Sequence, residues 1–141
     1  MANGSTLGKL ERVKKRKVIE EIFDSGESFL ISPFKVFYIS KSVSIQERII
    51  GHEKREVDSS LQFGVAVSKK NFKKAVDRNR IKRLVREAYR TQKGELKKSL
   101  DDKGDQSLSL FIVYIGKQMP EFTVVKEKVS AILRRLAKKM M

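Results

Sequence analysis

The residues with the clearest chemical potential lie within residues 75–90, AVDRNRIKRLVREAYR. At 100° per residue, one helical face is apolar, as in a helix packed on a core, and it comprises Ile81, Leu84, Val85 and Ala88. The opposite face comprises Asn79, Lys82, Arg83, Arg86 and Arg90, with Arg78 and Arg80 beside it near the helix start. Two acids, Asp77 and Glu87, accompany six cations, so this is not the mixed-sign surface of an ordinary solvated helix.

These residue types are suited to binding phosphates and bases. Arginine presents a planar fork of N–H donors that matches phosphate oxygens and stacks on bases. Asn79, placed among the arginines, offers both a donor and an acceptor, as a base edge or a 2′-hydroxyl requires. The stretch therefore predicts a nucleic-acid contact, and the alternative is a solvated charged face. Charge alone does not distinguish RNA from DNA.

The distribution of charge along the chain supports this prediction. The chain has 32 Lys+Arg and 17 Asp+Glu, a net charge of +15. Residues 69–98 hold 13 basic and 3 acidic side chains, and residues 9–17 hold 6 and 1, which gives +10 and +5. The longer stretch adds Lys69, Lys70, Lys73 and Lys74 to the candidate contacts. Such concentrated charge favours a phosphate backbone, whose neutralisation releases counterions, over an anionic membrane or an acidic protein.

Several kinds of chemistry are excluded by composition. The chain has no Cys and one His, His52, so thiolate sites and paired-histidine mechanisms are absent. Asp101, Asp102 and Asp105 cluster in the sequence but lack the ligand spacing of a calcium loop. We therefore expect no catalytic and no metal-ligating residue on the protein. No secretory signal or membrane span is evident, so we expect a cytoplasmic protein that does not contact a membrane.

The elements that must position these residues follow from periodicity. Residues 10–24 form an amphipathic helix that stops at Gly26, and residues 34–40 form a strand entered at Pro33. Residues 43–50 are a second strand or part of a hairpin, residues 51–60 a loop, and residues 62–68 a central strand. Asn71 caps the basic helix, which runs to about residue 93 and stops at Gly94.

The C-terminal part of the chain completes the predicted fold. Residues 99–107 are expected to be a charged loop, residues 108–115 an interior strand, and residues 123–140 an amphipathic helix. The order α-β-β-β-α-β-α predicts an α+β fold, with one mixed sheet packed by helices. At 141 residues we expect a single domain, with residues 1–8 a flexible extension and 139–141 a frayed end.

One segment resembles a known family. Residues 63–70, FGVAVSKK, followed after a short spacer by the Arg78-Asn79-Arg80 motif and its alternating basic and apolar residues, resemble the protein subunit of bacterial ribonuclease P. The resemblance implies an α/β sandwich with a left-handed βαβ crossover, which periodicity could not predict because such crossovers are usually right-handed. It also implies an RNA-binding subunit that assists a catalytic RNA in cutting the 5′ leader from precursor tRNA.

The resemblance further implies how the partners are arranged. The Arg-Asn-Arg helix lies against the catalytic RNA, and a cleft between the first helix and the sheet receives the leader. By position this cleft is lined by Lys15, Ile19, Phe23, Lys35 and Phe37. An aromatic residue is common in the family where Ile19 stands, the spacer lacks the usual glycine, and residues 43–60 form a longer segment than is typical. Mg²⁺ is expected mainly on the RNA, and no obligate protein partner is expected.

Two other function classes remain open from the residues alone. A non-catalytic RNA-binding module, such as a ribosome-associated protein, fits the same basic helix. A DNA-binding protein that inserts this helix in a major groove fits less well, because no zipper heptads follow it and no second recognition helix is evident.

Overall fold

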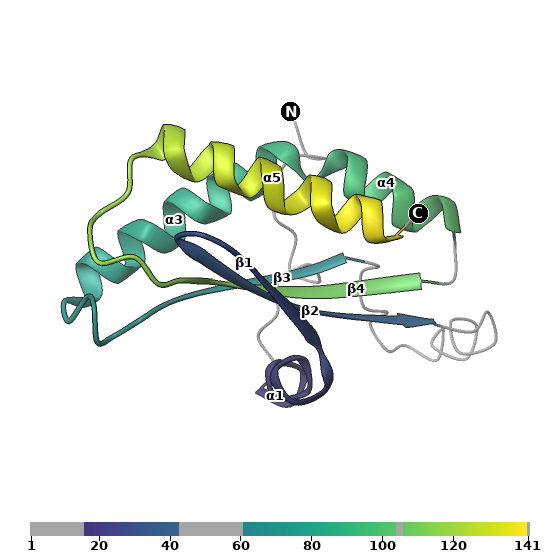
Figure 1. Ribbon diagram of the computed structural model, residues 1–141, viewed down its shortest axis with the longest axis horizontal. Helices are drawn as coiled ribbons and strands as arrows, with labels where there is room; N and C mark the ends of the chain where they lie inside the picture. The colour runs from purple at the N-terminus through teal and green to yellow at the C-terminus, as the bar shows by residue number, and fades with distance from the viewer. Residues whose placement is uncertain (1–15, 43–60, 104–105, 141) are drawn as a thin grey trace, which may run out of the picture.

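The structure, a computed structural model, describes residues 16–42, 61–103 and 106–140. Within these ranges a four-stranded sheet has three helices on one face and one on the other (Figure 1). In chain order the elements are α1 (Arg16–Ser25), β1 (Glu27–Ile31), β2 (Phe34–Ser42), β3 (Leu61–Val67), α3 (Ala75–Gln92), α4 (Gly94–Lys103), β4 (Gln106–Tyr114) and α5 (Phe122–Met140). This architecture confirms the predicted α+β class. None of the helices in these ranges is both long and apolar enough to cross a membrane.

The sheet is mixed, as predicted, with strand order β1-β2-β4-β3. β2 pairs antiparallel with β1 and with β4, whereas β3 and β4 are parallel. β4 is interior, as its apolar sequence indicated. The prediction that residues 62–68 form a central strand is wrong within the described sheet, because β3 lies at its edge. A continuous apolar run indicates that both faces of a strand are buried. It does not indicate whether the strand has neighbours on both of its edges.

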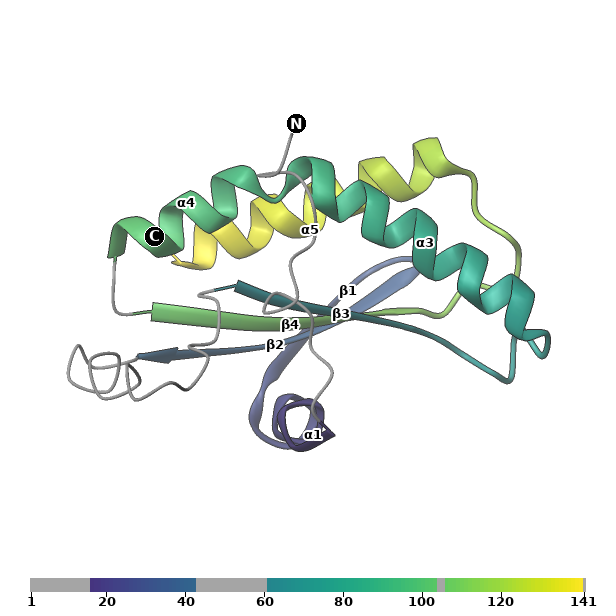
Figure 2. The same ribbon diagram turned by 180° about the vertical axis from the view of Figure 1, so that it is seen from behind.

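The connection from β3 through α3 and α4 to β4 is left-handed, as the resemblance implied. In Figure 1 the helical layer lies above the sheet, both strands run from right to left, and β4 lies nearer the viewer than β3. Figure 2 shows the same relation from behind, with β3 in front. This hand is uncommon for a crossover between parallel strands.

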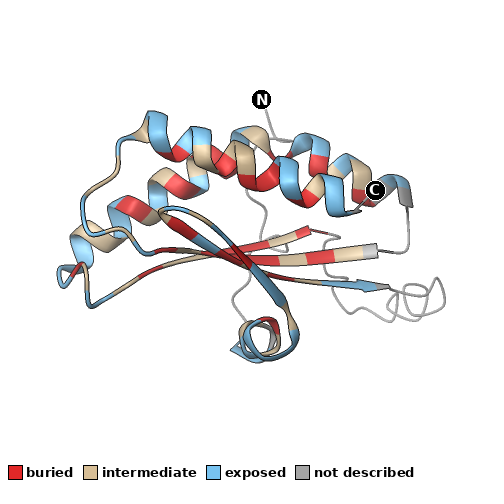
Figure 3. Cartoon of the chain, in the orientation of Figure 1, coloured by how far each residue is buried: buried red, intermediate tan, exposed pale blue. Residues whose placement is uncertain are grey.

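The larger core lies between the sheet and the three-helix layer. Alternation along β2 buries Phe34, Val36 and Tyr38 in this core, as predicted. The apolar stripe of α3 is also confirmed, since Ile81, Val85 and Ala88 are fully buried and Leu84 packs against the same core (a pattern visible in Figure 3). α3 is fixed to the sheet by Tyr89, whose ring stacks on Phe63 with centroids 3.9 Å apart.

A smaller core lies on the opposite face, under α1. Its buried members are Ile22 of α1 and Phe111 of β4. The side chains packed around them are Ile19, Phe37, Ile39, Ala66 and Val113. The chain turns from α1 into β1 at Gly26, where an added Cβ would lie 2.5 Å from the Tyr38 carbonyl oxygen. The predicted stop at Gly26 is therefore confirmed, and this close approach seats α1 on the sheet.

Two elements escaped the sequence analysis. β1 pairs with β2 as a hairpin, but only Phe29 of its five residues is buried, too few for a periodic signal. The predicted loop at residues 99–107 is wrong over most of its length, because α4 begins at Gly94 and continues to Lys103. Most of its residues are charged or polar, which is typical of a loop. Its two leucines, Leu96 and Leu100, lie one turn apart and are both buried. The predicted end of the basic helix is confirmed, since α3 ends at Gln92 with Lys93 as its C-cap, but Gly94 begins a second helix directly after it. Residues 43–60 lie outside the described residues.

Candidate nucleic-acid interface

α3 presents its basic residues along the side that faces away from the sheet. The side chains of Asn79, Arg80, Arg83 and Arg86 are exposed, and those of Arg78, Lys82 and Arg90 are half-buried. The preceding segment adds Lys69, Lys70, Lys73 and Lys74, which are all exposed. None of these side chains enters the core, which is the placement that the sequence analysis required. We call this set of residues the α3 basic surface.

Arg78 has a second task within this surface. Its Nη1 donates hydrogen bonds of 2.8 Å to the carbonyl oxygens of Phe72 and Lys73, in the turn that leads into α3. A guanidinium that holds two backbone carbonyls fixes the path of this turn, and with it the positions of the neighbouring lysines. The first arginine of the Arg-Asn-Arg motif thus orders the site in addition to adding charge.

The start of α3 differs from the predicted cap. The N-cap residue is Lys74, and it makes no side-chain capping bond. Asn71 instead donates through Nδ2 to the carbonyl oxygens of Ile115 and Gly116, at 3.2 and 3.3 Å. The predicted cap at Asn71 is therefore wrong. The Asn71 side chain could either cap the nearby helix or bind groups that are distant in sequence. Here it makes the distant contact and ties the turn before α3 to the segment that follows β4.

Arg90 is engaged with a carboxylate at the far end of the surface. Its Nε donates to Glu87 Oε1 at 3.3 Å, and its Nη2 donates to Glu87 Oε2. These hydrogen bonds from Arg90 lower the pKa of the Glu87 carboxyl, and the same pair raises the pKa of Arg90. The Glu87 carboxylate thus competes with any anionic ligand for the Arg90 guanidinium.

A second candidate surface lies on the opposite face of the sheet, beside α1. Phe23 of α1 is 42% exposed, and its ring centroid lies 4.5 Å from that of Phe37 and 5.5 Å from that of Phe111. Lys35 is exposed, with its Nζ 5.3 Å from the Phe37 ring centroid. Ile19 packs at the edge of the same cluster. Four of the five predicted cleft residues therefore meet in one place, and Lys15 lies outside the described residues.

A further member of this surface, Phe111 of β4, was not predicted from the sequence. Phe111 touches the Phe23 ring and pairs in register with Phe37 on β2 and with Gly64 on β3. Ala66 of β3 packs against the same cluster. Alternation along β4 places Phe111 on the same face as Val113, and this was the signal available in the sequence.

The described residues do not form a metal-binding cluster. In residues 16–42, 61–103 and 106–140, no three or more His, Cys, Asp or Glu side chains lie close enough together to hold an ion. The two surfaces therefore consist of cations, one amide and aromatic rings. Such groups are suited to bind, orient and neutralise a polyanion.

Comparison with known proteins gives a consistent family. The family model Ribonuclease P matches residues 7–137. The Ribonuclease P protein component of Porphyromonas gingivalis is 36% identical over 131 residues, covering 93% of this chain and 86% of that protein. The Ribonuclease P protein component of Chlorobium phaeobacteroides is 34% identical over 139 residues, covering 94% and 88%.

Solved structures agree in fold. The RNase P protein of Thermotoga maritima superposes with a TM-score of 0.61 at 24% identity, covering 89% of this chain and 96% of that one. The RNase P protein of Staphylococcus aureus gives a TM-score of 0.61 at 20% identity, covering 89% and 94%. The motif in α3, the left-handed crossover and the family match over nearly the whole sequence agree, and the chain belongs to the ribonuclease P protein family.

Proposed function

We propose that this chain is the RNA-binding subunit of a ribonucleoprotein ribonuclease P that removes the 5′ leader from precursor tRNA in the cytoplasm. The observation that supports it most directly is the α3 basic surface, where Asn79, Arg83 and Arg86 are exposed on the motif that the family match covers. The catalytic RNA subunit is the proposed occupant of that surface. The alternative of a ribosome-associated RNA-binding module has no observation of its own in its favour.

The second surface suits a single-stranded leader. Its Phe23 and Phe37 rings give a stacking platform that tolerates different bases, and Lys35 beside them suits a phosphate. The cleft and the α3 basic surface lie on opposite sides of the sheet (Figure 1). This arrangement supports a protein that holds the catalytic RNA on one side and the leader on the other. Positioning of this kind lowers the barrier by supplying orientation before the chemical step.

The phosphodiester hydrolysis is assigned to the RNA subunit. Among the described residues no group of three or more His, Cys, Asp or Glu could hold an ion, and no step of the proposed role uses an ion held by this protein. The protein contributes cations that offset repulsion between RNA strands, together with a defined site for the leader. Both contributions favour assembly at Mg²⁺ concentrations where the RNA strands alone repel each other too strongly.

The test is cleavage of precursor tRNA by the RNA subunit at low Mg²⁺, with and without this protein. We expect the protein to raise the cleavage rate at low Mg²⁺ and to have a smaller effect at high Mg²⁺. Binding of the RNA subunit without any change in cleavage would instead favour the non-catalytic module. Catalytic RNA that co-purifies with the tagged full chain is a second, independent readout.

A further inference from the structure

α5 is a third basic element that the charge count conceals. Residues 122–141 hold six Lys/Arg and one Glu, a net charge of +5. This excess is cancelled in the total by residues 18–68, with five basic and eight acidic side chains, and by residues 99–121, with two and four. Glu121 directly precedes α5, and the other acids of these two stretches lie 17 or more residues before it. The last part of α5, from Arg134 to Lys139, has four cations and no acid.

The four cations of this part lie on two sides of the helix. Arg135 and Lys139 form one pair with a spacing of four residues, and they cover aromatic rings of the sheet. The Arg135 guanidinium lies 4.4 Å from the Phe29 ring centroid, and the Lys139 ammonium lies 6.0 Å from that of Tyr38. Arg134 and Lys138, each one residue earlier, are also exposed, and both line a groove beside α5. Their charge is thus not used to pack the sheet.

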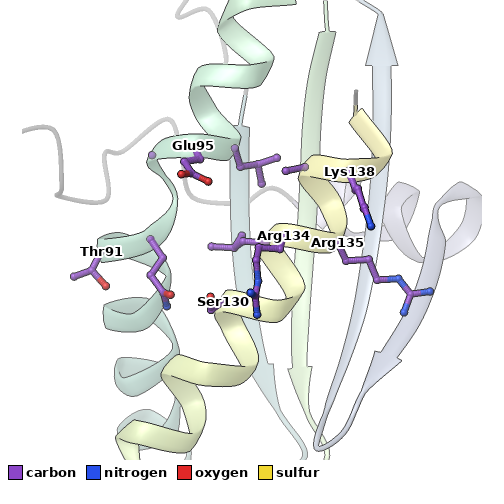
Figure 4. A pocket seen from close by; sticks show the side chains of 11 residues that line it. Thr91, Glu95, Ser130, Arg134, Arg135 and Lys138 are labelled. Carbon is purple, nitrogen blue, oxygen red and sulfur yellow. The ribbon is translucent and has the colours of Figure 1, made fainter.

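Arg134 and Lys138 border a groove of about 890 Å³ between α5 and the junction of α3 with α4 (Figure 4). Thr91, Gln92 and Glu95 form the wall across from α5, and Leu96, Leu133 and Ala137 add apolar lining. Gln92 Nε2 donates to the Lys126 carbonyl oxygen at 3.2 Å, which ties the end of α3 to α5 and fixes the width of the groove there.

The groove has an excess of positive charge. Its lining includes Arg134, Arg135 and Lys138 but one acid, Glu95. Among the residues that the structure describes, neither Arg134 nor Lys138 has a carboxylate within ion-pairing distance. Arg134 and Lys138 are long, exposed cations one helical turn apart, and they are suited to contact phosphates of a nucleic-acid strand. The partly apolar floor of the groove can then contact the riboses of that strand.

We propose that this groove, which we call the α4–α5 groove, is a second contact site for phosphates of the catalytic RNA subunit. The inference rests on the proposed function and extends it to a new surface. The groove begins at the last turn of α3, the helix assigned to the RNA subunit, and it lies across the sheet from the cleft assigned to the leader (Figure 1). An RNA that lies along α3 therefore reaches the groove, whereas a leader bound beside α1 does not.

The first test compares two double variants of the full chain with equal loss of charge. Arg134→Ala/Lys138→Ala removes two of the three cations that line the groove, and Lys126→Ala/Lys128→Ala removes two cations of the same helix that do not line it. We expect the groove variant to bind the RNA subunit about tenfold more weakly, and its salt slope to fall by about 1.5 to 2, roughly two phosphate contacts. The control variant should lose less than half of that slope.

The second test locates the bound RNA. The chain has no Cys, so Ser130→Cys gives a unique thiol on the groove wall for a tethered iron chelate that generates hydroxyl radicals. In the assembled complex, we expect strand scission in the RNA subunit, at nucleotides different from those cut by a probe at Arg83→Cys. Scission confined to the precursor tRNA would overturn the assignment to the RNA subunit, and so would no scission at all.

These outcomes separate the groove from the overall function. If the wild-type chain fails to bind the RNA subunit or to stimulate cleavage, the proposed function is wrong. If the wild type does both and the groove variant behaves as its Lys126/Lys128 control does, the groove inference alone is wrong. Thermal unfolding of all variants checks that the changes in binding do not come from loss of the fold.

Discussion

Glu87 and Arg90 form an ion pair on the surface of α3, three residues apart, in which the Arg90 Nε lies 3.3 Å from Glu87 Oε1. The pair stands at the end of the α3 basic surface and lowers the pKa of the carboxyl. It engages one cation of the α3 basic surface with a carboxylate. The same carboxylate therefore competes with RNA phosphate for Arg90.

Removal of this competitor should strengthen RNA binding. We expect Glu87→Gln to tighten binding of the RNA subunit by about two- to fivefold at low salt, since an exposed ion pair is weak and its loss frees the Arg90 guanidinium for a phosphate. The salt slope should steepen by about one phosphate contact. The matched control is Glu127→Gln, which makes the same change in net charge on the exposed side of α5. An equal gain in the control would mean that total charge, and not Arg90, sets the affinity.

Arg83 and Arg86 should each contribute about one phosphate contact. We expect Arg83→Ala and Arg86→Ala to weaken RNA binding and to reduce the slope of log K against log salt by about 0.7 to 0.9 each. Filter binding over a range of KCl concentrations measures both quantities. An unchanged slope in the double variant would assign this face of α3 to solvation alone.

Much of the α3 surface was predictable because a helix repeats every 3.6 residues. The positions of Ile81 and Val85 fix which side is buried, and Arg83 and Arg86 then face away from the core. The alternation along β2 placed Phe37 opposite Val36 for the same reason. Local periodicity determines which face a residue occupies, and both binding surfaces depend on that.

Contacts between distant segments could not be predicted in this way. Asn71 looked like a helix cap, yet it binds carbonyl groups at the end of β4, more than 40 residues away. α4 was missed because Leu96 and Leu100 become an apolar face only when α5 and β4 lie against them. The positive charge of α5 did not show in the total because acids outside that helix, in residues 18–68 and 99–121, offset it. In each case the decisive partner comes from another element of the fold.

The two arginines of the motif should differ in their effect on stability. We expect Arg78→Ala to lower the free energy of unfolding by about 1 to 2 kcal/mol, because it removes two hydrogen bonds from a charged donor to backbone carbonyls. Arg80→Ala changes an exposed side chain and should cost less than about 0.5 kcal/mol. Urea unfolding of the two variants provides the comparison. Equal stability losses would show that the bonds to Phe72 and Lys73 contribute little.

The cleft beside α1 should discriminate between tRNA with and without a leader. We expect Phe37→Leu, which keeps an apolar side chain but removes the ring, to weaken binding of precursor tRNA by about 1 kcal/mol or more, the low end for one stacked base. Binding of mature tRNA by the same assembled complex is the internal control and should change little. Equal losses for both substrates would rule out a leader-specific role for Phe37.

Tyr114 should make stability depend on alkaline pH. Its ring is buried, which raises the pKa of its phenol above 10, and the hydroxyl donates to the Gln118 carbonyl oxygen at 2.6 Å. As the pH rises above 10, the unfolded chain releases this proton before the folded chain does, so the free energy of unfolding falls.

Tyr114→Phe cannot titrate and should lose less stability between about pH 9.5 and pH 11. At neutral pH this variant should already be less stable by about 1 kcal/mol, because the Gln118 carbonyl loses its donor. Urea unfolding at several pH values measures both effects. Parallel pH dependences in the two proteins would show that Tyr114 ionises equally in the folded and unfolded chains, contrary to the effect of its burial.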